Sequence, residues 1–256
     1  MFRDFLKKDA PVSSEGFRYR GLQSSRLENI TDAVFGFAIT LLVISLEVPK
    51  SYVELQASLY SFPGFVICTG LLLLLWNSHY VFFKKYGLED NITKTLNFFF
   101  LFLLLFYVYP LKYLFNILGT LIWLKIKLAL GDKSEAMMLK IKEFQQLNLS
   151  GDQWQDLMIT YGLGALAIYA VILLFHMNAL RQKEKLELNE IEIYDTKVQV
   201  WANVIMMAVP AISIMLVYLL HPRLVWISGM IYSLYGIFLP VYHRIAERRR
   251  KHIYGF

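Results

Sequence analysis

The chain has 256 residues, of which 57% are hydrophobic, 16% aromatic and 18% charged, and its formal net charge is +6. Soluble domains are about 45–50% apolar and about 25% charged, so this composition disfavours a soluble fold. The apolar residues fall in long blocks, which indicate membrane spans of about 20 residues each. The single cysteine, Cys68, excludes an internal disulfide and a multi-cysteine metal site.

The first 26 residues are polar and of mixed charge, and no small-residue cleavage site follows the first apolar block. This pattern is not that of a signal peptide. Residues 1–26 are therefore predicted to be a cytoplasmic segment, and we expect the first span to be retained.

Six apolar blocks follow, and they predict an all-α, polytopic integral membrane protein with six transmembrane helices in residues 27–243. The predicted helices cover about 27–48, 57–83, 96–118, 157–180, 198–220 and 224–242. Cytoplasmic loops carry an excess of lysine and arginine, and an inside N-terminus places most of the 26 such residues on the cytoplasmic side. We therefore predict a multi-pass cell-membrane protein with both termini cytoplasmic and a basic cytoplasmic tail at 244–256.

The longest predicted connection, residues 119–156, alternates apolar residues with lysines in TLIWLKIKLAL and has helical spacing in EAMMLKIKEF. It is predicted to be an extracellular amphipathic connection at the membrane surface, although the first of these stretches also fits a strand. Asp152 and Gln155 resemble a capping box for the helix that follows.

Two charged stretches are predicted on the cytoplasmic side. The loop RQKEKLELNEIEIYDTK has charges of both signs, which indicates a solvated extension of a helix. The tail AERRRKH is predicted to anchor the last helix on the inside, and binding of anionic lipid head groups is the alternative.

Motifs that carry enzyme chemistry are missing from the chain. It has no phosphate-binding loop, no H-E-x-x-H zinc motif and no G-x-S-x-G nucleophile elbow. The histidines at 79, 176, 221, 243 and 252 include no pair at the i, i+4 spacing of helical metal ligands. We therefore expect no enzyme, no metal site, no cofactor and no nucleic-acid partner. The potassium-filter sequence T-V-G-Y-G is missing too.

The first predicted helix has two faces. Phe37, Leu41 and Ile44 recur at spacings of four and three and form one stripe, which Thr40 flanks about 60° from Phe37. Asp32 lies about 140° from Phe37, and an ionisable group inside a span is costly, so we expect it to reach a neighbouring helix. The stripe itself fits a functional surface, lipid contact or ordinary helix packing.

The second predicted helix contains WNSHYVFF, in which Trp76 and His79 share a face. With the N-terminus inside, they lie at the membrane depth of Asp32, where unpaired polar groups are costly. We therefore expect Trp76 and His79 to pair with Asp32 and Arg26; an ordinary interfacial histidine is the alternative.

Arg26, Thr31 and Asp32 stand in the stretch RLENITD, which resembles the R-x-x-x-F-S-D motif of the transmembrane protein 175 family of potassium channels. The continuation DAVFGFAITLLVISLEVP and the Trp76-x-x-His79 pair are similar to that family too. The resemblance is specific over residues 26–49 and moderate over 70–83, and elsewhere only the six-span layout is shared.

The resemblance implies a homotetramer of six-span subunits in which the first helices line a central pore without a re-entrant filter loop. By position, it places the apolar constriction at Phe37, the threonine linked to K⁺ selectivity at Thr40, and further pore positions at Leu41 and Ile44. It also implies a polar network that supports the fold and does not conduct. That network consists of Arg26, Thr31, Asp32, Trp76, His79 and, in a third-helix stretch that fits the family only loosely, Asn97.

Three positions depart from the family pattern. Ile30 and Thr31 replace Phe and Ser, and Thr31 keeps the hydroxyl group. Phe37 stands where the family usually has Ile or Leu, so a ring of four phenylalanines could close the pore more tightly or offer cation–π faces.

The resemblance therefore implies a cation channel for K⁺, selective or weakly selective, with a hydrophobic constriction that would gate by steric closure and dewetting. Its predicted partners are its own copies, membrane lipids and the permeating K⁺ ions, which need no cofactor. Two alternatives remain open. One is a proton channel or proton-coupled secondary transporter that uses Asp32 and His79, and the other is a non-conducting membrane interaction protein.

Overall fold

The structure is a computed structural model, and it describes residues 11–13, 16–44, 50–131, 133–146, 150–220 and 226–255. Within these ranges the regular structure is helical, apart from an isolated bridge between Val12 and Arg18. The α-helices are α2 (Arg26–Ile44), α3 (Tyr52–Ser58), α4 (Phe62–Tyr86), α5 (Asn91–Ala129), α6 (Glu135–Gln146), α7 (Gly151–Arg181), α8 (Glu190–Leu219), α9 (Trp226–Met230) and α10 (Tyr235–Tyr254). Two short 3-10 segments, η1 (Leu59–Ser61) and η3 (Ile231–Leu234), precede α4 and α10.

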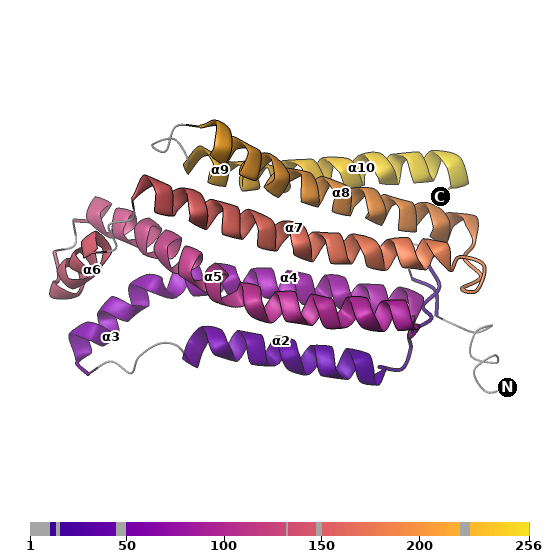
Figure 1. Cartoon of the computed structure of the whole chain (residues 1–256), viewed down its shortest axis with the longest axis horizontal. Helices are drawn as coiled ribbons and strands as arrows, with labels where there is room; N and C mark the ends of the chain where they lie inside the picture. The colour runs from indigo at the N-terminus through magenta and orange to yellow at the C-terminus, as the bar shows by residue number, and fades with distance from the viewer. Residues whose placement is uncertain are drawn as a thin grey trace.

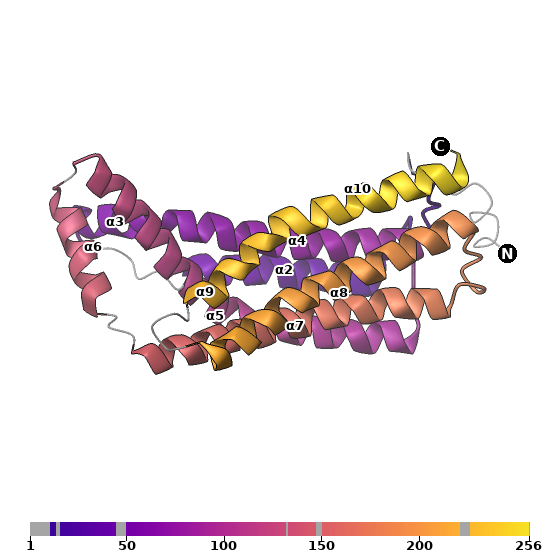
Figure 2. The ribbon, with the colours of Figure 1, turned by 90° about the horizontal axis from the view of Figure 1, so that it is seen from above.

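The long helices lie side by side in an elongated bundle (Figure 1). α2 packs against α4 and α5, whereas α7 joins α5 to α8, and α8 packs against α10. The starts of α2, α5 and α8 and the end of α10 lie at one end of the bundle, which we call the α2-start end. α3 and α6 lie together at the other end, the α3–α6 end, in both views (Figure 2).

Four helical stretches among the described residues are long and apolar enough to cross a membrane. They are Tyr52–Tyr86, Asn91–Ala129, Gly151–Arg181 and Glu190–Leu219, and they correspond to the second to fifth predicted spans. The first and sixth predicted spans fall on α2 and on α9, η3 and α10, which do not meet the same measure; residues 45–49 and 221–225 lie outside the described ranges. The protein is thus an all-helical, multi-pass membrane protein, and the count of six spans stays a prediction.

The regular structure that the described part of 119–156 contains is helical. α5 runs without a break to Ala129 and therefore extends past the predicted third span, and α6 follows as a separate helix. The extension is held by apolar packing, because Leu124 of α5 joins Tyr60, Ala136 and Met137 in one buried cluster. The possibility that TLIWLKIKLAL forms a strand is therefore wrong.

Side-chain caps set where the helices begin. Ser150 and Gln153 form the capping box of α7, each side chain accepting a hydrogen bond from the other residue's backbone N–H. The predicted box of Asp152 and Gln155 is wrong, because Asp152 already lies inside the first turn.

The main core lies between α2, α4, α5 and α7. Near the α3–α6 end, the backbones of α4 and α5 come into direct contact at two glycines, Gly64 and Gly119. A Cβ on Gly64 would lie 1.9 Å from the carbonyl oxygen of Phe115, and a Cβ on Gly119 would lie 2.3 Å from the nitrogen of Gly64. Small residues permit this close approach between membrane helices.

Candidate functional site

One face of α2 is built into the subunit. Thr31, Phe35, Ala38 and Leu42 are buried, and their spacing of four, three and four residues follows one side of a helix. Phe35 packs against Phe100 of α5 with ring centroids 6.0 Å apart. Burial of this stripe fixes which way α2 faces within the subunit.

The opposite face of α2 is exposed and carries the predicted stripe. Phe37 is 57% exposed and Leu41 is 37% exposed, and Thr40 between them is exposed as well. Thr40 Oγ1 donates a hydrogen bond to the carbonyl oxygen of Phe37 at 2.7 Å, so the hydroxyl hydrogen is engaged and the oxygen lone pairs stay available. The side chain of Ile44 lies outside what the structure describes.

Three of the predicted network residues form a buried chain across three helices. Thr31 donates to the carbonyl oxygen of Leu27 at 2.8 Å, and Asn97 Nδ2 donates to Thr31 Oγ1 at 2.9 Å. His79 Nε2 lies 2.7 Å from Asn97 Oδ1; a carbonyl oxygen only accepts, so Nε2 carries the hydrogen. The chain ties α2 to α4 and α5 in the core.

Asp32 belongs to a second, separate contact. Trp76 Nε1 donates to Asp32 Oδ1 at 2.8 Å, and the Trp76 ring stacks on Tyr80 with centroids 5.6 Å apart. Arg26 is exposed and makes no hydrogen bond or ion pair within the described part of the chain. The six predicted network residues are thus divided between a buried chain, a surface pair and a lone arginine.

Lys112 contacts α2 and was not singled out from the sequence. Its Nζ donates to the carbonyl oxygen of Leu42, in the last described turn of α2, at 2.5 Å, and a hydrogen bond from a charged group is stronger than a neutral one. The sequence feature that could have identified Lys112 is a single lysine in a long apolar run, two residues after Pro110.

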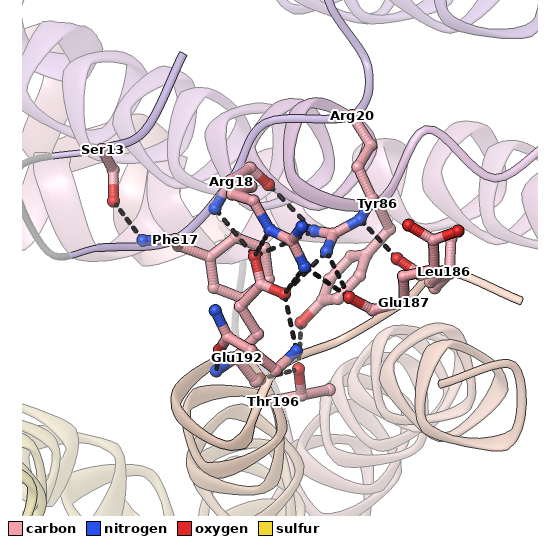
Figure 3. Close-up of polar contacts among 10 residues, drawn as sticks. Ser13, Phe17, Arg18, Arg20, Tyr86, Leu186, Glu187, Glu192 and Thr196 are labelled. Atoms are coloured by element: carbon pink, nitrogen blue, oxygen red, sulfur yellow. Dashed lines mark hydrogen bonds and ion pairs between the residues drawn. The ribbon is translucent and has the colours of Figure 1, made fainter. Parts of the chain in front are cut away.

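A buried carboxylate lies at the α2-start end, where the sequence predicted only a solvated helix extension. Glu192, in the first turn of α8, is fully buried, and both Arg18 and Arg20 reach its Oε2, at 3.2 and 2.6 Å. We call these three residues the Glu192 clamp (Figure 3). The prediction of a solvated extension is wrong for Glu192, because residues far apart in the chain cover it. Asn189 and Glu192 form the capping box of α8. The sequence contains this pattern, an asparagine followed three residues later by a glutamate.

Asp90 makes a third polar connection at the same end. It caps α5, accepting from the backbone and the hydroxyl of Thr93, and it accepts from Asn178 of α7 at 3.2 Å. Burial alone raises the pKa of Asp90, but hydrogen bonds from Thr93, Gln182 and Asn178 outweigh it and lower the pKa below the ordinary value.

The described residues contain no group of three or more His, Cys, Asp or Glu side chains that could hold a metal ion. The side chains at the exposed face of α2 are instead an aromatic ring, an aliphatic chain and a hydroxyl. Such a face can exclude water or touch a passing ion, but it supplies no acid, base or nucleophile.

Comparisons with known proteins agree with this chemistry. Residues 26–107 match the model of the family described as endosomal/lysosomal potassium channel TMEM175. A protein of Marivirga tractuosa named "Potassium channel" is 39% identical over 241 residues, which cover 93% of each chain. A crystal structure of a variant of the potassium channel MtTMEM175, in complex with a nanobody–MBP fusion protein, matches with a TM-score of 0.76 and 36% identity, covering 93% of this chain and 100% of that one.

These relatives are named as channels and not as enzymes, and none of their names implies a cofactor. The match to the Marivirga protein spans nearly the whole length of both chains, and the family model covers α2 together with α4 and the first part of α5. The chain therefore belongs to the TMEM175 family of potassium channels.

Proposed function

We propose that this protein is a K⁺ channel, selective or weakly selective, assembled from four copies whose α2 helices line the pore. The observation that carries the proposal is the division of α2 into two faces. One face is fixed inside the subunit, whereas the face with Phe37 and Thr40 is exposed along a helix that belongs to a membrane protein. A pore lined by one helix per subunit needs several subunits, and closed cyclic symmetry supplies them.

In this proposal, Phe37 forms the constriction. Four phenylalanine rings around an axis would close the pore sterically and would favour dewetting, which is how hydrophobic constrictions gate. Thr40 lies on the next turn, and since its hydrogen is donated to the carbonyl of Phe37, its oxygen can face a cation. Leu41 and Ile44 extend the apolar lining.

The predicted polar residues serve the scaffold. Asn97 has no titratable group, and it separates His79 from Thr31 by direct hydrogen bonds, while Asp32 pairs with Trp76. Neither contact joins Asp32 to His79, as a direct proton relay between them would require. This supports ion conduction over proton-coupled transport.

The proposal includes the predicted topology. Residues 1–26 and the basic tail at 244–256 are cytoplasmic, residues 27–243 form a six-helix channel domain in the cell membrane, and 119–156 is the extracellular connection. The clustering of the α2 start and the α10 end at one end of the bundle (Figure 1) is consistent with termini on one side.

K⁺ and Na⁺ flux into proteoliposomes tests the pore assignment. Phe37→Ala is expected to increase flux because it widens the constriction, and Thr40→Ala is expected to lower the K⁺/Na⁺ flux ratio. Phe102→Ala is the matched control, since Phe102 is an equally exposed phenylalanine on α5. If both α2 variants behave like the control, the pore does not run along this face.

Native mass spectrometry of the detergent-solubilised protein tests the assembly. Four copies are expected. A monomer in mild detergent that also conducts no K⁺ would favour the non-conducting interaction protein.

A further inference from the structure

The segment that enters α2 is held at the α2-start end by several independent contacts. We call residues 16–25 the pre-helix segment; it joins α2 directly at Arg26. Phe17 is fully buried and its ring meets that of Tyr86 edge-on, with centroids 5.6 Å apart. The backbone N–H groups of Arg20 and Gly21 both donate to the carbonyl oxygen of Lys84.

Gly21 lets this segment lie directly on the end of α4. A Cβ at Gly21 would lie 2.2 Å from the carbonyl oxygen of Phe83, a backbone atom that cannot turn aside. The pre-helix segment is therefore seated on α4, and no side chain separates the two backbones there.

The Glu192 clamp fastens the same segment to α8. Besides the two arginine side chains, the backbone N–H of Arg18 donates to Glu192 Oε1 at 2.9 Å. Arg20 Nε donates to the carbonyl oxygen of Leu186 at 2.8 Å, and the Arg18 guanidinium donates to that of Glu187. The carboxylate and the carbonyls of the α7–α8 turn thus surround both guanidinium groups (Figure 3).

Thr196 extends the connection along α8. It donates to the carbonyl oxygen of Glu192 at 2.6 Å, so the Tyr86 hydroxyl, 2.7 Å from Thr196 Oγ1, donates to Thr196. The side chain of Glu192 is fully buried, and an uncompensated buried charge is strongly destabilising. Release of both arginines would therefore leave a buried charge unpaired.

This geometry connects two parts of the bundle that share little packing. α2 packs against α4 and α5, whereas α8 packs against α7 and α10. We infer that Glu192 is a positioning residue for the pore: by holding Arg18 and Arg20 it fixes where α2 begins, and a displacement of the first turn of α8 is passed to α2. The inference rests on the proposed pore lining by α2.

Single-channel recording in planar bilayers tests this role. Glu192→Gln keeps the shape of the side chain and removes its charge, and it is expected to change the open probability by at least about fivefold, the lower range of coupling between sites. The unitary conductance and the K⁺/Na⁺ permeability ratio are expected to stay at the wild-type values, because Phe37 and Thr40 are untouched.

Asp195→Asn is the matched control. Asp195 lies on the same helix three residues later, and its ion pair with Arg250, 2.9 Å long, joins α8 to α10 instead of to the pre-helix segment. A purely structural role for Glu192 predicts that both variants lose thermal stability and keep the wild-type open probability, and that result would overturn the inference.

Two further variants keep the test informative even if Glu192→Gln fails to fold. Arg20→Lys keeps the charge but loses the forked contact with Glu192 and Leu186, and it is expected to change open probability in the same direction. Arg20→Glu combined with Glu192→Arg restores one carboxylate between two guanidinium groups and is expected to return the open probability toward wild type. Failure of both effects contradicts the inference.

Hydrogen exchange separates this inference from the proposed function. The amides of Arg20 and Gly21 are expected to exchange faster in Glu192→Gln than in Asp195→Asn. If the wild-type protein passes no K⁺, the proposed function fails, whatever the exchange shows. If it conducts and the Glu192 variants release the segment without changing the open probability, only the positioning role fails.

Discussion

The two ends of the bundle are held together by different physical interactions. At the α2-start end, several contacts between distant segments are polar, beside apolar ones such as Phe17 with Tyr86: the Glu192 clamp, the Asp90–Asn178 contact and the chain from Thr31 to His79. At the α3–α6 end, helices meet through apolar packing, with Gly64 against Phe115 as the closest approach. Polar contacts depend on single atoms and can be released one by one, whereas close packing tolerates almost no change of volume.

The largest loss of stability is expected at the packed end. Gly64→Ala places a Cβ against backbone oxygen, so α4 and α5 must separate, and overpacking of this kind costs about 3 kcal/mol. Gly70→Ala is the control on the same helix, because a Cβ there meets nothing within 4 Å, and alanine is the better helix former. Thermal unfolding in detergent measures both, and equal midpoints would contradict the close contact.

The next effect is expected from the buried polar chain. Asn97→Leu keeps the volume but leaves the donor of His79 unpaired in the core, which costs about 2 kcal/mol. Asn77→Ala removes an exposed asparagine from α4 and is expected to change stability by less than about 0.5 kcal/mol. A loss in Asn97→Leu no greater than in Asn77→Ala would show that the chain of hydrogen bonds adds nothing.

A smaller loss is expected at the last described turn of α2. Lys112→Met keeps the apolar stem and removes the ammonium group that donates to Leu42, and a hydrogen bond from a charged group contributes about 1.5 kcal/mol. Lys112→Arg should restore much of it, and Lys125→Met, an exposed lysine on the same helix, should be near neutral. Unfolding midpoints of the three variants decide whether the contact between Lys112 and Leu42 stabilises the protein.

The smallest effect is expected at Asp90. Asp90→Ala removes the cap of α5 and costs about 1 kcal/mol, whereas Asp90→Asn keeps a capping side chain. Because the pKa of Asp90 is lowered in the folded state, its charge stabilises the protein above the unfolded pKa of about 3.9, and this contribution is lost as the pH falls through the folded pKa. Unfolding midpoints measured from pH 6 downward should therefore fall less steeply in Asp90→Asn; parallel curves would refute the assignment.

Much of the α2 site could be predicted from the sequence. Helical periodicity placed Phe37 and Leu41 on one stripe, and the structure finds both exposed. The high cost of polar groups in a span predicted partners for Asp32 and His79, and both have them. The expected contact between Trp76 and Asp32 is present, whereas His79 pairs with Asn97 and Arg26 makes no hydrogen bond or ion pair within the described residues.

The Glu192 clamp could not be predicted in the same way. Its arginines stand 174 and 172 positions before Glu192 in the chain, and periodicity describes only neighbours on one helix. The loop around Glu192 has charges of both signs, which is typical of a solvated segment. Only the capping pattern of Asn189 and Glu192 could be recognised from the sequence, because these two residues are three positions apart.

Local residue order was enough to predict a helical chain that spans a membrane and to show which residues share a face of α2, because helix period and hydrophobic length depend on local residue order. The packing of distant helices set which face of α2 is buried, brought Lys112 to the carbonyl oxygen of Leu42, and buried Glu192 as an anchor for the segment that enters α2. Those outcomes depend on which distant helices pack together, and partners so far apart in the chain meet only when the bundle has formed.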